Sequence, residues 1–387
     1  MDNKTIHGLT ALRGLAALGV TIFHYHLMIS QIANDNTIIN HLYLMVDLFF
    51  VLSGFIMLHV YGSWFRHAVS PSAYGVYMRA RFARIYPVHL FTLGITIIIS
   101  LIYFKVFNLS DSWYTNVVFE YDQIISHVFL INAMGTFFDA TWNTPAWSIS
   151  VEWWAYTLFP FIALLHGRFP RVSIFAICTF IVIGYYLLIT HFSPLFWEER
   201  WQQLGIAAGT PYPRLTVDVI TGSAFLRALL GMSIGILIYR MYSSKIWYQT
   251  LSSRYAAATV VIIYCLTLYS DLVVDPVHIV LMGILILSIA YRNEKNVILR
   301  TKSAVFLGEI SYSLYLVHVP VILIITMIRR YIVPEDPLFK DVGFNFPAYI
   351  TYPGLLIYIL LIIVIAFLTN RFIEAPLRNR IKGGTHV

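Results

Sequence analysis

Long apolar segments alternate with short polar connections along the whole chain. Most segments keep hydrophobic side chains for about 20 consecutive residues, the length that an α-helix needs to cross a bilayer. The pattern predicts an all-α, polytopic integral membrane protein of about ten transmembrane helices, in a single domain over residues 1–387. The predicted spans are 8–31, 40–62, 86–107, 145–166, 172–191, 217–239, 255–271, 274–292, 304–328 and 347–369.

Composition agrees with this fold class. The chain is 59% hydrophobic and only 12% charged, whereas a soluble domain has about 25% charged residues. Both cysteines, Cys178 and Cys265, fall within apolar segments and are expected to be unreactive. The first apolar segment is long enough to span and contains Arg13, so we expect it to remain as an uncleaved first helix.

Lysine and arginine are distributed unevenly between alternate connections. Outside the predicted spans, 18 of them lie on one side of the membrane and 6 on the other. The positive-inside rule then places both termini in the cytoplasm and the connections at 108–144 and 192–216 outside. The net charge of +7 is therefore a signal of topology. It gives no reason to expect nucleic acid as a partner, whereas membrane lipid is expected.

Ionisable residues inside an apolar span are costly and need a reason. Arg13 and His24 are eleven residues apart, so they share one face of the first helix and lie about 16 Å apart along its axis. Arg13 then faces the cytoplasmic end, and His24 faces a deeper level of the same groove. A purely structural interpretation also stays open, in which Arg13 snorkels to the interface and His24 makes an interhelical hydrogen bond.

Polar residues on four further spans are predicted to lie at a similar depth. We therefore expect them to share a polar cavity within the membrane. On their helices, Ser148 shares a face with Glu152, and Tyr315 shares one with His318. Together with His24, this layer consists of Asp47, Ser148, Glu152, Arg227, Tyr315 and His318.

A cluster of arginines precedes the third predicted span, on the cytoplasmic side. Arg81 and Arg84 are three residues apart and adjacent on a helix, and Arg79 lies close by. Such a cluster commonly anchors a span against anionic lipid. It could also bind phosphate, because the guanidinium fork matches phosphate oxygens.

These segments together resemble the acyltransferase-3 family of integral membrane acyltransferases. Arg13 and His24 match the family's Arg-x10-His pattern, and Arg81 and Arg84 match its Arg-x2-Arg pattern. The resemblance covers most of the chain, and the motifs stand in the family's order. They are "LRGLAALGVTIFHYH", "VDLFFVLSGFIM", "RFARIYP", "AWSISVEWWAY", "LGEISYSLYLVHVPV" and "RFIEAPLR".

The resemblance implies an enzyme of the bacterial inner membrane that O-acylates a glycan. The expected donor is cytoplasmic acyl-coenzyme A, usually acetyl-coenzyme A, which acts as a co-substrate, and no permanently bound cofactor is expected. The expected acceptor is a hydroxyl of a lipid-linked glycan or of an exported polysaccharide, such as an exopolysaccharide or a lipopolysaccharide O-antigen. The chain looks like the short members of the family, which lack an SGNH-type domain.

Within this interpretation the candidate residues have expected roles. His24 acts as general base or carries the acyl group, because the unperturbed pKa of histidine lies near neutrality. Asp47 or Glu152 orients the ring of His24, and Arg13 either lines the route of the donor or holds its phosphate or carbonyl group. The donor-phosphate candidates are Arg79, Arg81 and Arg84, and the substrate-binding candidates are His318, Ser148, Tyr315 and Arg227.

Other function classes remain open. A secondary transporter, or a flippase for acyl groups or lipid-linked glycan, would also place charged residues in a cavity at the membrane midplane. A non-catalytic member of a polysaccharide assembly complex is a third class, and a homo-oligomer is a further expected partner state. We expect no metal site, because the histidines are dispersed rather than grouped at ligand spacing.

Overall fold

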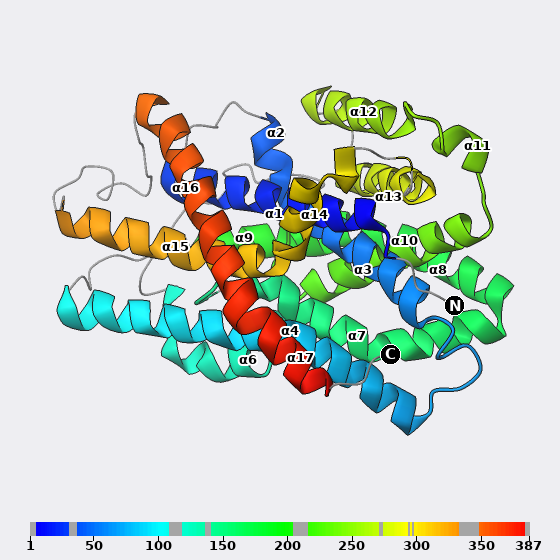
Figure 1. Cartoon of the computed structure of the whole chain (residues 1–387), viewed down its shortest axis with the longest axis horizontal. Helices are drawn as coiled ribbons and strands as arrows, with labels where there is room; N and C mark the ends of the chain where they lie inside the picture. Colours follow the sequence, from blue (N-terminus) through cyan, green and yellow to red (C-terminus); the bar gives the residue numbers. More distant parts are fainter. Residues whose placement is uncertain are drawn as a thin grey trace.

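The chain folds into a bundle of long apolar helices (Figure 1). Among the described residues, eight helical segments are long and apolar enough to cross a membrane, two shorter apolar helices accompany them, and no β-strand occurs. The prediction of an all-α polytopic membrane protein is confirmed. The computed structural model describes residues 5–30, 37–107, 118–135, 141–203, 216–270, 274–292, 295, 298–332 and 348–383.

The longer helices account for the membrane-spanning part of the chain. They are α1 (His7–Tyr25), α3 (Met45–Tyr61), α4 (Pro71–Leu101), α7 (Ala146–Arg168), α8 (Pro170–Leu187), α10 (Ala224–Ser243), α12 (Ala256–Ser270), α13 (Asp275–Tyr291), α15 (Ser311–Ile332) and α16 (Ala348–Thr369). Each predicted span overlaps one of these helices. The predicted limits at residues 31, 271 and 347 lie outside the described residues.

Shorter elements connect or extend these helices. The short α-helices are α2 (Thr37–Asn40), α6 (Ile124–Val128), α9 (Ser193–Gln203), α11 (Tyr248–Leu251), α14 (Lys302–Glu309) and α17 (Ala375–Lys382). Turns of 3-10 helix are η2 (His41–Leu44), η4 (Tyr121–Gln123) and η6 (Ile298–Arg300). Turns of π-helix are η1 (His26–Ser30), η3 (Ile102–Val106), η5 (Leu188–Phe192) and η8 (Asn370–Glu374).

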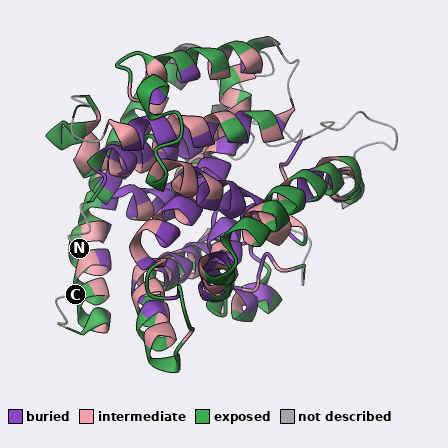
Figure 2. Cartoon of the chain, turned by 90° about the vertical axis from the view of Figure 1, so that its right-hand side faces the viewer, coloured by how far each residue is buried: buried purple, intermediate pink, exposed green. Residues whose placement is uncertain are grey.

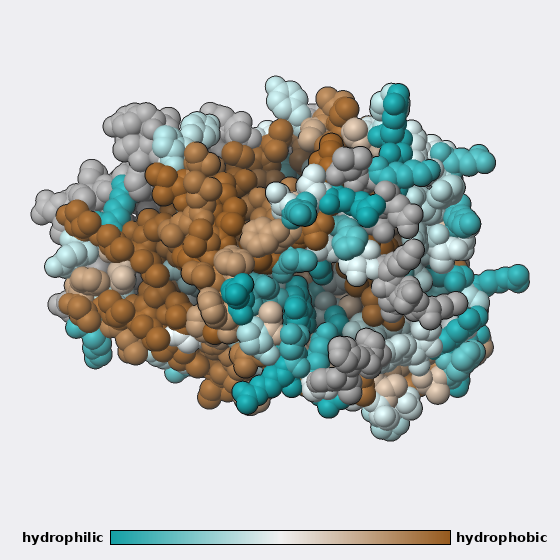
Figure 3. Space-filling model, in the orientation of Figure 1, coloured by the Kyte–Doolittle hydropathy of each residue, from teal (hydrophilic) through white to brown (hydrophobic). Residues whose placement is uncertain are grey.

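The helices differ in how deeply they lie in the bundle. In Figure 1, α1, α4 and α15 run along the long axis, α16 crosses them obliquely, and both termini lie toward the same end. Buried residues fill the centre of the bundle (Figure 2), where α1, α3, α10 and α15 are the most buried spans. Hydrophobic side chains cover the end away from the termini in Figure 3, and hydrophilic ones gather near the termini. Helices α8 and α16 are mostly exposed and apolar, as expected of surfaces that face lipid.

Helices α3 and α10 pack backbone against backbone. A Cβ atom at Gly54 of α3 would overlap the carbonyl oxygen of Met232, and one at Gly235 of α10 would overlap the carbonyl oxygen of Val51. Small residues permit this close approach, which is a common way to pack helices inside membranes. The two helices therefore form a fixed unit at the centre of the bundle.

Helix α4 begins well before the predicted span 86–107. Ser70 caps it by accepting a hydrogen bond from the backbone N–H of Ala73 (3.3 Å), and Pro71 occupies its first position. The helix then continues through the arginine segment to Leu101. The arginines are helical, as expected of Arg81 and Arg84, and they lie on the same continuous helix as the predicted span that follows them. Arginine is a good helix former, although a hydropathy window excludes it.

The predicted span 217–239 is helical only from Ala224. Residues 216–220 are not helical, and Gly222 has a φ of +56°, which favours glycine. Arg227 therefore lies in the first turn of α10, and its expected position near the middle of a span is wrong. A short apolar run does not by itself distinguish a helix from an extended segment.

The predicted span 304–328 consists of two helices, α14 and α15, which are separated at Ile310. Helix α14 lies against α1, where Gly14 contacts the backbone at Gly308 and a Cβ atom on Gly308 would overlap the carbonyl oxygen of Thr10. This contact fixes α14 beside the N-terminal part of α1. Helix α15 then leads away from it into the interior of the bundle.

The last predicted span, 347–369, is extended at its C-terminal end. Helix α16 continues through η8 into α17, which packs against α4. This continuation places the buried carboxylate of Glu374 beside the arginine segment of α4.

Candidate functional site

A cavity lies between α1, α3, α4, α7 and α15. It brings together several sequence candidates, some from the predicted donor site and some from the deeper polar layer. These lining residues are Arg13, Arg81, Arg84, Ser148, Glu152 and Tyr315. The remaining candidates, Arg79, His24, Asp47, Arg227 and His318, lie outside the lining that the described residues form.

Three arginines give this cavity a strongly basic lining. Arg81 donates a hydrogen bond from Nη2 to the hydroxyl of Tyr61 (2.7 Å) and lies over the rings of Tyr61 and Tyr156, 5.0 and 5.6 Å from their centroids. Arg84 forms an ion pair with Glu374. The Nε atom of Arg13 is buried without a hydrogen-bond partner among the described residues. Such an arrangement suits an anionic ligand.

Glu152 supplies a carboxylate to the same cavity. Its Oε1 atom accepts hydrogen bonds from the hydroxyls of Ser53 on α3 and of Tyr156 one turn further along α7, the latter at 2.6 Å. Two hydroxyl donors from different helices therefore hold the carboxylate in place. Tyr156 also contacts Arg81, so Glu152 and the arginine segment belong to one connected group.

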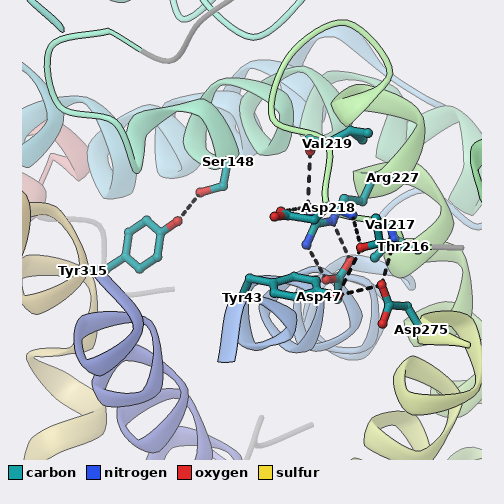
Figure 4. Close-up of polar contacts among 10 residues, drawn as sticks. All are labelled: Tyr43, Asp47, Ser148, Thr216, Val217, Asp218, Val219, Arg227, Asp275 and Tyr315. Carbon is teal, nitrogen blue, oxygen red and sulfur yellow. Dashed lines mark hydrogen bonds and ion pairs between the residues drawn. The ribbon is translucent and has the colours of Figure 1, made fainter. Parts of the chain in front are cut away.

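At its deeper end the cavity reaches a hydroxyl pair. The hydroxyls of Ser148 and Tyr315 are 2.7 Å apart (Figure 4), and they lie 3.0 and 3.3 Å from the carbonyl oxygen of Pro145, which accepts from the hydroxyl that does not donate to the other. The ring of Tyr315 meets the ring of His318 edge-on, with centroids 5.8 Å apart. The lining of the cavity therefore adjoins the histidines of the polar layer.

His24 and His318 lie in contact with each other. His24 Nδ1 is 3.3 Å from His318 Nε2 and 3.0 Å from the carbonyl oxygen of Val20, and the two ring centroids are 4.9 Å apart. A carbonyl oxygen can only accept, so these partners assign the proton of a neutral His24 ring to Nδ1. The lone pair of His24 then lies on Nε2, where it is available to accept a proton.

The structure does not place a carboxylate beside His24. Within the described residues, Glu152 binds Ser53 and Tyr156, and Asp47 binds Arg227, so neither carboxylate reaches the imidazole. Its contacts are instead a second imidazole and a backbone carbonyl. Carboxylates and a second histidine were all expected at the depth of His24 in the membrane. Depth, which follows from counting residues along each helix, does not determine which of these side chains contacts His24.

Asp47 and Arg227 form a separate, fully buried polar group (Figure 4). Arg227 donates from Nε and Nη2 to the two oxygens of Asp47, at 3.0 and 2.7 Å. Its Nη1 donates to the carboxylate of Asp218 (3.1 Å) and to the carbonyl oxygen of Val219 (3.2 Å). The guanidinium is thus satisfied by protein groups, and it joins α3, α10 and the non-helical segment before α10.

Asp275 extends this group to α13. Its Oδ2 atom accepts hydrogen bonds from the hydroxyl of Tyr43 and the backbone N–H of Val217, both at 2.8 Å. The Tyr43 hydroxyl is also 3.1 Å from Thr216 Oγ1. Asp218 lies in the non-helical segment that precedes α10. Burial raises the pKa of its carboxyl group, and the positive charge of Arg227 opposes that shift. These contacts hold the segment at residues 216–220 in its non-helical form.

Several of these residues were not singled out from the sequence. Asp218 and Asp275 are isolated acids near the ends of apolar segments, which was the signal available for them. Glu374 lies in the "RFIEAPLR" motif, and it contacts Arg378 (3.3 Å) and the hydroxyl of Ser313 (2.7 Å) in addition to Arg84.

Arg79 differs from the two other arginines of its segment. It lies on α4 between them and the N-terminus of the helix, but its side chain is exposed rather than directed into the cavity. The expectation that Arg79 helps to bind a donor therefore has less geometric support than the same expectation for Arg81 and Arg84. Over the described part of the chain, no three histidine, cysteine, aspartate or glutamate side chains are grouped so that they could hold a metal ion.

Comparison with known proteins identifies the family. The chain matches the family model described as an acyltransferase domain, Acyl_transf_3, over residues 6–373. It is also similar to "Protein 2 in picA locus" of Rhizobium radiobacter, with 35% identity over 88 residues. That alignment covers 22% of this chain and 41% of the relative. No solved structure matches significantly. Since the family model covers nearly the whole chain, the chain belongs to the acyltransferase-3 family of membrane acyltransferases.

Proposed function

We propose that the chain transfers an acetyl group from cytoplasmic acetyl-coenzyme A to a hydroxyl of a polysaccharide or lipid-linked glycan, across a bacterial inner membrane. One observation carries this proposal. A cavity with three arginines and a glutamate leads from the arginine segment of α4 to Tyr315, and the ring of Tyr315 adjoins the His24–His318 pair. A basic entrance and a paired histidine at the other end suit a phosphate-bearing donor whose reactive group enters first.

The arginines are the proposed contacts for the phosphates of coenzyme A. Arg81 and Arg84 lie one turn apart on α4 and face the same cavity as Arg13. Guanidinium groups bind phosphate oxygens through paired hydrogen bonds. Arg13 and His24 are about 16 Å apart along α1, which is comparable to the reach of an extended pantetheine arm. The thioester would then lie near His24 while the nucleotide remains among the arginines.

His24 is the proposed general base. Its Nε2 lone pair takes the proton of the acceptor hydroxyl, and the oxygen attacks the carbonyl carbon of the thioester. The carbon–sulfur bond then breaks, and the proton passes to the coenzyme A sulfur, so that the products are the ester and the free thiol. His318 Nε2 lies 3.3 Å from His24 Nδ1, whose proton faces the Val20 carbonyl oxygen at 3.0 Å, and the two groups together would stabilise the imidazolium. An acyl group carried on His24 is the alternative route.

Glu152 is the proposed supporting carboxylate. Ser53 and Tyr156 hold it in the cavity, and its charge offsets part of the positive charge of the arginines. It lies among the residues that would surround the donor and does not contact His24. Its expected role is therefore to position groups in the cavity rather than to attack substrate.

The transporter alternative has less support from this arrangement. Arg227 and Asp47, which were the buried charges expected in a shared midplane cavity, are paired with each other away from the cavity that the arginines line. The guanidinium is bound on all sides by protein groups, so exchange of a coupling ion at this place would require several hydrogen bonds to break.

The test of the proposed function is donor-dependent bond formation. Purified chain in proteoliposomes receives radiolabelled acetyl-coenzyme A and surface polysaccharide that has been de-O-acylated with mild alkali. We expect equal amounts of free coenzyme A thiol and labelled polysaccharide, and neither product with His24→Ala. Movement of solute without thiol release would favour a transporter. Acetylation that survives His24→Ala in cells would favour a non-catalytic partner.

A further inference from the structure

One wall of the cavity is a stripe of side chains along a single face of α3. Counted from its first residue, the stripe occupies positions i, i+3, i+4, i+7, i+10 and i+11, which is the spacing of one helix face. All of its members are apolar except a serine in the middle. They are Val46, Phe49, Phe50, Ser53, Ile56 and Met57. The serine therefore divides the wall into two apolar parts.

Contacts with other helices show how this stripe runs along the cavity. Near one end, the sulfur atom of Met57 accepts a hydrogen bond from Nη1 of Arg81 (3.7 Å), so that end lies beside the arginines. Near the other end, the ring of Phe49 meets the ring of Tyr315 edge-on, with centroids 5.7 Å apart. The part of the stripe before Ser53 therefore lines the deep end of the cavity.

The deep end of the cavity is mainly apolar. Its wall includes the buried side chains of Val46 and Phe50, and that of Ile149, which follows Ser148 on α7. The polar groups there are the hydroxyls of Ser148 and Tyr315, which are 2.7 Å apart and bond to each other. Such a surface favours an apolar group over a charged or strongly hydrated one.

Phe49 differs from its apolar neighbours at the deep end because its side chain is only partly buried. It packs against all three buried hydrophobic clusters that the described residues form, and the cavity adjoins the surface that it keeps accessible. The adjacent Phe50 is 1% exposed, and a Cβ atom on Gly231 of α10 would lie only 2.7 Å from its own Cβ. Phe50 is thus fixed against α10, whereas Phe49 presents its ring to the cavity.

Phe49 is separated from the histidine pair by a single ring. The ring of Tyr315 contacts both Phe49 and His318, with centroids 5.7 and 5.8 Å away. His318 in turn contacts His24. The apolar deep end therefore adjoins the residues to which the proposed reaction is assigned.

The cavity is small for the molecule that it is proposed to receive. Its volume is about 110 Å³, whereas pockets that enclose a drug-sized ligand hold roughly 300–1,000 Å³. A whole acyl-coenzyme A molecule does not fit into this volume, but a short acyl group at the tip of an extended donor does. Because overfilling a closely packed interior is costly, the end wall would limit the length of the acyl chain.

We propose that the deep end of the cavity is the acyl pocket and that Phe49 sets the longest acyl chain that it accepts. This inference rests on the proposed function, because it requires an acyl donor that enters from the arginine end. The ring of Phe49 occupies the space that the outer carbons of a butyryl chain would need, so acetyl is transferred in preference. Phe49 contacts the acyl chain and takes no part in proton transfer.

The experiment compares two donors in variants at two positions of α3. Phe49→Ala enlarges the deep end of the cavity. Ile56→Ala is the matched control, because Ile56 is also apolar and partly buried but lies seven residues later on the same face, toward the arginines. Each protein, in proteoliposomes with de-O-acylated polysaccharide, receives acetyl- or butyryl-coenzyme A, and thiol release gives kcat/KM. If Phe49→Ala does not fold, Phe49→Leu takes its place.

The expected result is a change of donor preference at one position only. The wild-type chain should prefer acetyl- to butyryl-coenzyme A at least about tenfold, and Phe49→Ala should reduce this ratio at least about tenfold, since one methylene group in an apolar pocket commonly changes kcat/KM about 10–200-fold. Ile56→Ala should leave the ratio nearly unchanged. Equilibrium binding of the two thioesters needs no turnover, and it should shift toward butyryl-coenzyme A in Phe49→Ala even if that variant is inactive.

Other outcomes separate the acyl pocket from the proposed function. An unchanged ratio in Phe49→Ala, or an equal change in Ile56→Ala, would refute the pocket while acetyl transfer by the wild-type chain stands. Equal loss of both donors in Phe49→Ala would mean that Phe49 only packs the bundle, and equal use of both by the wild-type chain would also refute the limit. If the wild-type chain transfers neither acyl group, the proposed function fails, and the acyl pocket fails with it.

Discussion

Arg227 and Asp47 form a fully buried ion pair between α10 and α3, with two parallel hydrogen bonds of 3.0 and 2.7 Å. The two residues do not contribute equally to the network. Arg227 has a second carboxylate partner in Asp218, whereas Arg227 is the hydrogen-bond partner that the described residues provide for Asp47. Removal of the arginine therefore leaves two carboxylates without this cation, and removal of the aspartate leaves the arginine with one carboxylate, Asp218, and the carbonyl oxygen of Val219.

This asymmetry predicts the order of stability of two variants. Arg227→Met should lower the free energy of unfolding by about 3–5 kcal/mol, because it leaves buried charge uncompensated, and Asp47→Asn should lower it by less. Thermal unfolding of the purified protein in one detergent measures both changes. Equal losses, or a larger loss for Asp47→Asn, would mean that Asp218 does not act as a second partner in the membrane.

The histidine pair gives a prediction for activity. His24→Ala should reduce acetyl transfer by roughly 10²–10⁴-fold, the usual contribution of a general base, with acetyl-coenzyme A binding retained. His318→Ala should reduce it less, because His318 faces Nδ1 of His24 rather than the reacting lone pair.

The control for the pair is His26, two residues along α1 from His24 and about 200° around the helix. His26→Ala should transfer acetyl groups nearly as well as the wild-type chain. If His26→Ala fails while His24→Ala works, the groove lies on the other face of α1. Label retained on the wild-type protein in the absence of acceptor, and absent from His24→Ala, would identify an acyl-histidine intermediate.

The arginines of α4 should differ in their effect on the donor. Arg81→Ala and Arg84→Ala should raise the apparent KM for acetyl-coenzyme A, since both side chains line the cavity, and Arg79→Ala should raise it least because that side chain is exposed. Lysine at position 81 or 84 should restore only part of the affinity, because the bidentate fork is lost. If the apparent KM for acetyl-coenzyme A is unchanged when Arg81 and Arg84 are both replaced by alanine, these arginines do not bind the donor, and the lipid-anchoring interpretation is favoured.

Glu152→Gln should reduce the activity of the protein without a matching loss of stability. The amide oxygen can still accept from Ser53 and Tyr156, so yield and thermal stability should be close to wild type. The charge that faces the arginines is lost, and acetyl transfer should fall strongly. A glutamine variant that is fully active, and more stable because a buried charge has been removed, would make Glu152 a structural acid only.

His127 lies in α6, outside the membrane-spanning helices, and its burial should make the stability of the protein depend on pH. Burial, and to a smaller extent the nearby His89, lowers the pKa of His127 to about 3 from its ordinary 6.5. Between these values the unfolded chain binds the proton more readily, so the free energy of unfolding falls as the pH decreases from about 6.5 towards 3, by up to about 1.4 kcal/mol per pH unit.

His127→Gln removes this titration and can still bond to Thr141, as His127 Nε2 does at 3.0 Å. The Tm difference between about pH 7 and pH 5 should be larger for the wild-type chain than for the glutamine variant, in a matched detergent. The same difference in both proteins would show that His127 is not buried as a neutral ring.

The fold class could be predicted from the sequence because apolar length is a direct consequence of bilayer thickness. The start of α4 could not be predicted in this way, because a hydropathy window excludes the segment that contains Arg81 and Arg84, although that segment is helical and both arginines line the cavity. The position of Arg227 was missed for a related reason. Its helix begins only after a segment that Asp218 and Asp275 hold in a non-helical form, and such long-range bonds leave no periodic signal.

The partners of the site residues were harder to predict than their depth. Depth along a helix follows from residue counting, and His24 and His318 indeed come from spans that the sequence placed in one layer. The contacts within that layer depend on how each helix is rotated about its axis and how closely it packs on its neighbours. One example is the close approach of α3 and α10, which Gly54 and Gly235 permit. The sequence therefore suggested a carboxylate beside His24, and the structure places an imidazole there.

The contact of α3 with α10 also limits how the sequence can vary. Any side chain larger than hydrogen at Gly54 or Gly235 would push apart the helices that carry Asp47 and Arg227. It would also displace Ser53, the neighbour of Gly54, from Glu152. Two positions that have no reactive group of their own thus restrict the chain as strictly as the candidate site does. In a saturation mutagenesis screen they would look like active-site residues, although neither is among the residues that line the cavity.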